Sequence, residues 1–164
     1  MVILSIDQAL QVSGYAVFEN NKLVEHGTFS IPKSKPIEQR LGKFLEELTG
    51  LYHRYEFEKI IFEDIQEQHK NVVTFKHLAY VQATILNWCY WNDIKYEILA
   101  PSVWRKILGG KFGRKREEQK QHAIELVKDY YNVEVTSDEA DAICIGKAAI
   151  MQGYTTEVAF GSLN

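Results

Sequence analysis

The 164-residue sequence has only two cysteines and no long apolar run, and both absences narrow the class of protein. Cys89 and Cys144 lie in apolar, helix-like stretches, at no spacing typical of a metal site. We expect them to be buried thiols in a reducing compartment. No stretch approaches the length of a membrane span, and the chain has no linker, repeat or low-complexity tract.

A targeting segment is also not expected. The run Met1–Leu10 is interrupted by Asp7 and has no basic flank, which argues against a signal peptide. The chain is 46% hydrophobic and 25% charged, which suits one globular domain over residues 1–164. We therefore predict a cytoplasmic protein, in a bacterium or a phage-infected host, with no membrane contact.

The sequence lacks an excess of positive charge, and its net charge of −3 argues mildly against a nucleic-acid partner. The distribution changes that picture, because residues 105–120 carry +5 and the rest of the chain carries −8. Such a segment is either a solvated helix face or a basic stripe that steers an anionic ligand. Its basic residues are Arg105, Lys106, Lys111, Arg114, Lys115, Arg116 and Lys120.

Apolar periodicity divides the chain into strands and helices. We expect strands over 2–6, 14–19 and 22–31, a helix from 36, a strand over 59–62, a helix over 72–91, a strand over 95–99, and helices over 101–108, 115–131 and from 136 to about 151. Asn20-Asn21 is a hairpin turn, and Thr136 with Glu139 forms a capping box. This order predicts an α/β fold, a mixed sheet with helices on its faces.

Four carboxylates stand where these elements would bring them together. Asp7 ends the first strand and Glu63 the fourth, and ligands collect at the carboxyl ends of strands in open α/β sheets. Asp138 and Asp141 share one face at the start of the last helix. Each feature alone is more often structural, but clustered carboxylates repel, and a hard divalent cation relieves the repulsion. Two ions about 3.5–4 Å apart would suit in-line phosphoryl displacement.

The neighbouring acids Glu63 and Asp64 leave a choice. Neighbours on a strand point to opposite faces, so we expect only one of them to face the site. We choose Glu63, because Ile61 and Phe62 continue the strand directly into it, and keep Asp64 as the alternative.

Three segments resemble, in order, motifs of the RuvC-type Holliday-junction resolvases of the ribonuclease-H-like nuclease superfamily. Residues 6–18 (IDQALQVSGYAVF) resemble their opening hairpin, residues 61–66 (IFEDIQ) their second acidic strand, and residues 137–146 (SDEADAICIG) their acidic helix. The resemblance covers residues 1–150 or so and implies a ribonuclease-H-like mixed five-stranded sheet flanked by helices.

The resemblance also implies a function. It points to a structure-selective endonuclease that cuts branched DNA (Holliday junctions, forks and flaps) with two Mg²⁺ or Mn²⁺ ions per site. The catalytic and metal-binding acids carried over are Asp7, Glu63, Asp138 and Asp141, with Asp7 bridging both ions. The family further implies a homodimer, and the helix over 72–91, apolar on more than one side, suits burial against a second chain.

Two departures from the family pattern bear on substrate choice. Gln8-Ala9 follows the first acid where members usually carry Pro-Gly, and Gln66 stands where cellular enzymes carry an aromatic wedge. Phe75 is a candidate substitute for that wedge. Both departures fit better with phage-encoded members, so we keep the substrate broad.

Candidate DNA contacts lie in two segments. The stronger is the glycine-containing basic loop, because Lys and Arg neutralise a phosphate backbone. The other follows Glu63, where a polar loop with a helix cap is an equally good explanation. The predicted DNA-binding residues are Lys70, Phe75, Lys76, Arg105, Lys106, Lys111, Arg114, Lys115 and Arg116; Asn71 and Thr74 are further candidates for phosphate contact.

Three alternatives stay open. The first is a branched-DNA-binding protein of the same fold with weak or no cleavage. The second is an RNA/DNA-hybrid nuclease, which the acids do not distinguish. The third, an actin-like ATPase domain, is disfavoured because the chain is short of a second lobe and lacks phosphate-binding glycines near Asp7, so we expect no nucleotide cofactor.

Overall fold

Three antiparallel strands begin the fold, in agreement with the three strands and the hairpin turn expected from the sequence. The computed structural model describes residues 1–66, 71–110 and 112–153. The turn between the second and third strands is made by Asn20 and Asn21, with positive φ angles of 50° and 66°. Two positive φ angles in a two-residue turn match the right-handed twist of the strands it joins.

The elements follow the predicted order. They are β1 (Val2–Asp7), β2 (Val12–Glu19), β3 (Lys22–Ser30), α1 (Ile37–Tyr55), β4 (Lys59–Glu63), α2 (Val72–Asn92), β5 (Lys95–Leu99), α3 (Pro101–Leu108), α4 (Arg116–Tyr131) and α5 (Ser137–Met151). The differences from the predicted bounds are small. The second strand begins two residues earlier than expected, and Lys115 is the N-cap of α4 instead of its first residue.

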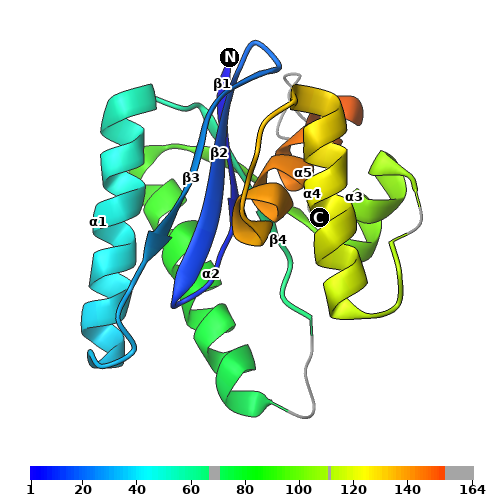
Figure 1. Cartoon of the computed structure of the whole chain (residues 1–164). Helices are drawn as coiled ribbons and strands as arrows, with labels where there is room; N and C mark the ends of the chain where they lie inside the picture. The colour runs from blue at the N-terminus through cyan, green and yellow to red at the C-terminus, as the bar shows by residue number, and fades with distance from the viewer. Residues whose placement is uncertain (67–70, 111, 154–164) are drawn as a thin grey trace, which may run out of the picture.

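The five strands form a mixed sheet in the order β3-β2-β1-β4-β5. β1 pairs antiparallel with β2 and parallel with β4, and β4 pairs parallel with β5. The predicted α/β fold is therefore confirmed (Figure 1). The pairing of β1 with β4 matters most for function, because it sets the ends of these two strands beside each other.

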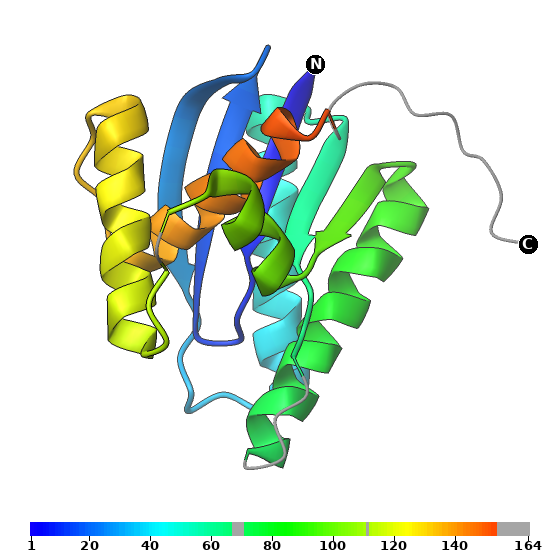
Figure 2. The same cartoon turned by 90° about the vertical axis from the view of Figure 1, so that its right-hand side faces the viewer.

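Helices cover both faces of the sheet. On one face α5 crosses the strands with α3 and α4 beside it, and Phe18, Trp104 and Ile143 are buried there (Figure 2). On the other face α1 and α2 bury side chains such as Phe44 and Ile85. Successive strand residues alternate between these two cores, as a pleated sheet covered on both sides requires.

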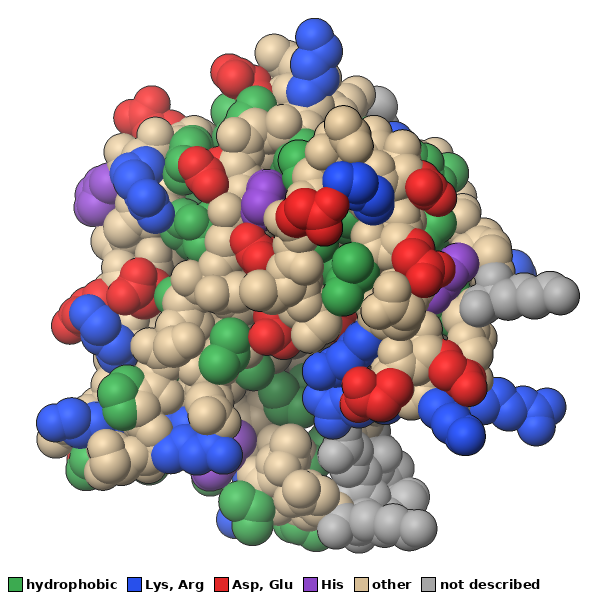
Figure 3. Space-filling view, in the orientation of Figure 1, with side chains coloured by type: hydrophobic (Ala, Val, Ile, Leu, Met, Phe, Trp, Pro, Cys, Tyr) green, Lys and Arg blue, Asp and Glu red, His purple; other side chains and the backbone are tan. Residues whose placement is uncertain are grey.

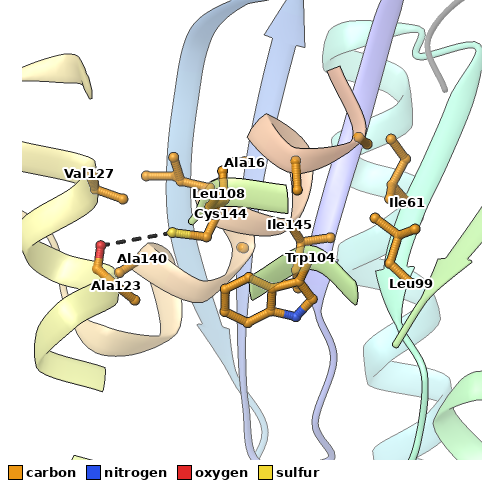
Figure 4. Close-up of a cluster of buried hydrophobic side chains, with 14 of the residues drawn as sticks. Ala16, Ile61, Leu99, Trp104, Leu108, Ala123, Val127, Ala140, Cys144 and Ile145 are labelled. Carbon is orange, nitrogen blue, oxygen red and sulfur yellow. Dashed lines mark hydrogen bonds between the residues drawn. The ribbon is translucent and has the colours of Figure 1, made fainter. Parts of the chain in front are cut away.

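Both cysteines are buried and free, as predicted, and burial raises the pKa of the Cys89 thiol to about 12. The Cys144 sulfur points at the backbone carbonyl oxygen of Ala123 on α4 (Figure 4). Within the described ranges, no helix is both long enough and apolar enough to span a bilayer.

The long helix α2 is only partly buried. Val81 and Ile85 pack in the core, whereas Val73, Tyr90 and Trp91 are exposed, the last two by 77% and 76%. The predicted apolar surface on more than one side is present, and part of it faces solvent.

Candidate active site

A cleft of about 790 Å³ lies at the carboxyl ends of β1 and β4. Ile6 pairs with Phe62 in the parallel ladder, so the next residues, Asp7 and Glu63, end adjacent strands. All four predicted acids line this cleft: Asp7, Glu63, Asp138 and Asp141. The structure therefore brings together residues that lie up to 134 positions apart in the sequence.

The start of α5 reaches Asp7 because β2 carries a glycine at the crossing point. Gly14 pairs with Asp7 in the β1–β2 ladder, and a Cβ at Gly14 would collide with the backbone carbonyl of Asp138. Further along, Ser5 Oγ donates a 2.7 Å hydrogen bond to the carbonyl oxygen of Ala142. These close contacts seat the first turn of α5 against the end of β1.

The same turn is fixed by its own cap. Thr136 Oγ1 accepts a hydrogen bond from the Glu139 backbone N–H, and Glu139 Oε2 accepts one from the Thr136 N–H at 2.8 Å. The second Glu139 oxygen, Oε1, lies 2.8 Å from His26 Nδ1 on β3. Although burial opposes it, hydrogen bonding to Thr136 and His26 lowers the pKa of Glu139. The predicted capping box is confirmed, and it ties α5 to the sheet.

The cluster is electrostatically strained. Burial first, then the charges of Asp141, Glu63 and Asp138, raise the pKa of Asp7 well above its usual range. Burial and the nearby Glu63 raise the pKa of Asp141 to about 7, although Arg105 and Lys120 oppose that shift. Like charges held close in a poorly solvated place favour either protonation or a cation.

Glu63 and Asp64 both line the cleft, but only Glu63 is among the charges that raise the pKa of Asp7 and of Asp141. The alternation argument holds only inside a strand, and β4 ends at Glu63. The two differ in their surroundings, because Glu63 Oε2 accepts a 2.7 Å hydrogen bond from Trp104 Nε1. Burial raises the pKa of Glu63, against the Trp104 hydrogen bond and the charge of Arg105.

Gln8, a departure from the family pattern, joins the two acidic strands. Its side chain is buried, donates from Nε2 to the Glu63 carbonyl oxygen, and accepts at Oε1 from the Glu63 N–H at 3.2 Å. The amide thus continues the β1–β4 ladder past its last backbone pair. Sequence reasoning took this position as a loss and gave no signal that it bridges the strands.

The predicted basic residues divide into two groups. Arg105, Arg114 and Arg116 line the cleft, whereas Lys106 and Lys115 are exposed outside its lining. Lys and Arg side chains gather over the start of α4, at the lower right of Figure 3. Lys70 and Lys111 lie outside the described residues.

The polar segment that follows Glu63 and enters α2 lines the cleft only in part. Asn71 and Thr74 line the cleft, but Phe75 and Lys76 do not. Asn71 also caps α2, since its Oδ1 accepts from the Thr74 N–H at 3.1 Å. Lys120, noted only as part of the basic segment, does line the cleft. Its recurrence one turn after Arg116 in a helix is the signal that could have placed it there.

Comparison with known proteins decides the family. The family model for crossover junction endodeoxyribonuclease RuvC matches residues 3–149. The chain belongs to this family. RuvC from Thermotoga petrophila is 27% identical over 165 residues, which cover 98% of this chain and 99% of that protein. The predicted resolvase family and its endonuclease class are thereby confirmed.

Two solved structures show the same fold. Thermus thermophilus RuvC in complex with a Holliday junction substrate matches with a TM-score of 0.78 at 16% identity, covering 94% of this RuvC-family chain and 96% of that one. Fowlpox virus resolvase with Holliday junction DNA matches with a TM-score of 0.64 at 16% identity, covering 95% and 100%. The ribonuclease-H-like architecture inferred from the motifs is confirmed.

Proposed function

We propose that this RuvC-family chain hydrolyses phosphodiester bonds in branched DNA, with Asp7, Glu63, Asp138 and Asp141 as its catalytic acids. The observation that carries the proposal is the convergence of all four on one cleft, beside Arg105 and other basic side chains. The relatives are named crossover junction endodeoxyribonucleases, and two of the similar structures hold Holliday junctions. We keep forks and flaps as further substrates.

The acids suit divalent cations by their chemistry. Carboxylate oxygens are the ligands that Mg²⁺ and Mn²⁺ prefer. Burial first, and then repulsion by the neighbouring acids, raises the pKa of Asp7, and a bound cation would relieve that repulsion. Within the described residues, no three His, Cys, Asp or Glu side chains are already arranged to hold an ion, so the carboxylates would have to draw together. Two bound ions, the number that the resemblance implies, would supply an activated water and stabilise the leaving oxygen.

The protein itself positions the DNA strand. Arg116, the first residue of α4, and Arg114 just before it line the same cleft as the acids, and their charges would neutralise phosphates on either side of the bond to be cut. Arg105 and Lys120 lie closer to the acids, since both lower the pKa of Asp141. These two are the best placed to contact the phosphate that reacts.

We also propose a homodimer in the cytosol. Support for the dimer is the exposed apolar side of α2, with Val72, Val73 and Tyr80 each at least 43% exposed. A two-fold dimer would match the two-fold symmetry of a four-way junction. Mass measured by light scattering across a dilution series tests it, and a concentration-independent monomer would contradict it.

The direct test of function is nicking of labelled four-way junction, fork and linear duplex DNA in Mg²⁺. Wild-type protein is compared with Asp7→Asn, which removes one charge while keeping the side-chain shape. We expect metal-dependent nicks on branched DNA and none from the variant. Glu63→Gln and Asp64→Asn are assayed beside it to separate the two neighbouring acids, with the larger loss expected for Glu63→Gln.

Each result has a defined meaning. Cleavage that persists in Asp7→Asn would overturn the site, and structure-selective binding without wild-type cleavage would leave a DNA-binding protein of this fold. Preferential cutting of an RNA/DNA hybrid duplex over the junction would move the proposal to a hybrid nuclease.

A further inference from the structure

Trp104 is the largest buried side chain of the short helix α3, and it has no counterpart among the predicted site residues. Pro101 begins this helix, and the amphipathic pattern turns Trp104 and Leu108 inward. Trp104 is fully buried beneath α5, near Ile145 in the core cluster drawn in Figure 4. Its ring is therefore held from several sides.

The polar edge of this ring is directed at the acidic cluster. Trp104 Nε1 donates a 2.7 Å hydrogen bond to Glu63 Oε2. Among the described residues, no donor reaches the other oxygen, Oε1. One oxygen of Glu63, a residue that lines the cleft, is thus fixed by a buried donor, and the other is not.

The face of the same ring carries a cation. The Arg105 guanidinium carbon lies 4.8 Å from the Trp104 ring centroid and 5.9 Å from that of Phe112. Within the described part of the chain, Arg105 makes no salt bridge, and its buried Nε has no hydrogen-bond partner. Held on two aromatic rings, Arg105 lies close enough to affect Glu63 without pairing with its carboxylate.

We propose that Trp104 is a positioning residue for Glu63. Its indole N–H fixes Oε2 and leaves Oε1 as the oxygen that would bind a divalent cation, and its ring holds Arg105 away from the carboxylate. The inference rests on the proposed function, because it takes Glu63 as a cation ligand. Hydrogen-bonding partners that orient a metal ligand typically contribute about 10–100-fold to metal affinity or activity.

A purely structural role is the competing explanation, because a buried indole N–H needs an acceptor somewhere. The chain offers a matched control in Trp88 of α2, whose Nε1 donates to Thr49 Oγ1 at 3.1 Å, away from the cleft. Trp88 is also nearly buried, with 7% of its surface exposed. Loss of the N–H at either position leaves one acceptor without its donor, but only Trp104 contacts an acid of the cluster.

The test replaces Trp104, and separately Trp88, by benzothienylalanine, which keeps the ring size and exchanges the N–H for sulfur. Mn²⁺ binding to the whole protein without DNA is measured by calorimetry, beside urea unfolding of the metal-free protein. We expect the Mn²⁺ dissociation constant to rise roughly tenfold or more at position 104 and to stay unchanged at 88. If the analogue at 104 fails to fold, Trp104→Phe, which also lacks the N–H, takes its place.

A double-mutant cycle with Glu63→Gln shows whether the change in Mn²⁺ affinity depends on Glu63. In that background, removing the N–H at 104 should cause no further loss of Mn²⁺ affinity. Unchanged Mn²⁺ affinity at 104, or an equal loss at 88, would overturn the inference while Asp7→Asn still abolishes cleavage. Cleavage by Asp7→Asn would instead remove the proposed function, and that outcome is separate.

Discussion

Gly14 faces the backbone of Asp138 with no space between them for a methyl group. Gly14 is also the ladder partner of Asp7, so the contact sets the distance between the first acid of the chain and the acids of α5. The close approach of α5 to the strands therefore depends on glycine at this one position of β2.

Gly14→Ala should both destabilise the protein and impair the site. Forcing a methyl group against a backbone carbonyl costs about 1–3 kcal/mol, and the helix must shift away from Asp7 to make room. Urea unfolding measures the stability, and Mn²⁺ calorimetry measures the site. Gly42→Ala in α1 is the control, because a Cβ there meets no atom within 4 Å. A Gly14→Ala protein with wild-type stability and Mn²⁺ affinity would contradict this account.

Gln8→Ala tests the side-chain bridge between the acidic strands. The change leaves the N–H and carbonyl of Glu63 without their partner, and a buried unpaired group costs about 1–3 kcal/mol. We expect lower stability and a clear loss of nicking rate. Gln11→Ala, an exposed residue of the same loop that also lines the cleft, should change stability little. Equal effects of the two variants would show that the bridge has no special role.

The pKa of Asp141, raised to about 7 chiefly by burial, predicts how stability depends on pH. The pKa of an aspartate in the unfolded chain is about 3.9. The metal-free folded protein should therefore lose stability as pH rises from about 4 to about 7, because ionisation is harder in the fold. Asp141→Asn removes that cost and should stabilise the metal-free protein at pH 8, by on the order of 1–3 kcal/mol.

Urea unfolding in EDTA across the pH range checks this prediction. Below about pH 4 the two proteins should converge, since the carboxyl is protonated in both folded and unfolded states. Asp129→Asn, on the exposed side of α4, should give no such pH-dependent gain. Adding Mn²⁺ at pH 8 should stabilise wild type more than Asp141→Asn. If Asp141→Asn is less stable than wild type at pH 8 in EDTA, the prediction is wrong.

The two groups of basic residues should behave differently toward DNA. Arg116→Gln removes a charge from the cleft and should weaken junction binding about threefold to tenfold. It should also reduce the slope of log affinity against log salt concentration by about one. Lys106→Gln removes an equal charge outside the cleft and should have less effect. Binding is measured in the Asp7→Asn background to prevent cutting. Matching losses for both would show that net charge alone steers the DNA.

Much of the fold was accessible from the sequence, because strand and helix periods are local properties. The apolar runs ending in Asp7 and Glu63 identified both site strands, and the spacing of Asp138 and Asp141 gave a shared helical face. Their meeting depends on β1 pairing with β4 and on the close approach at Gly14, which are tertiary features. The motif resemblance, more than periodicity, made that meeting predictable.

The parts that could not be predicted depend on where elements end and how they pack. Asp64 reaches the cleft because β4 stops one residue before it. Lys120 does so because it lies on the same side of α4 as Ala123 and Val127, which pack against α5. Gln8 looked like the loss of a family feature, and only the position of the Glu63 backbone reveals what its amide does.

The place of α5 in the sequence has a consequence for synthesis. Strands β1 and β2 leave the ribosome before α5, the helix that covers Ala16 and Phe18 and completes the acidic cluster. A nascent chain that has made β4 but not α5 holds only half of the acids and an uncovered sheet face. On the proposed assignment of the acids, such a chain cannot cut DNA, and its uncovered sheet face makes it prone to aggregate.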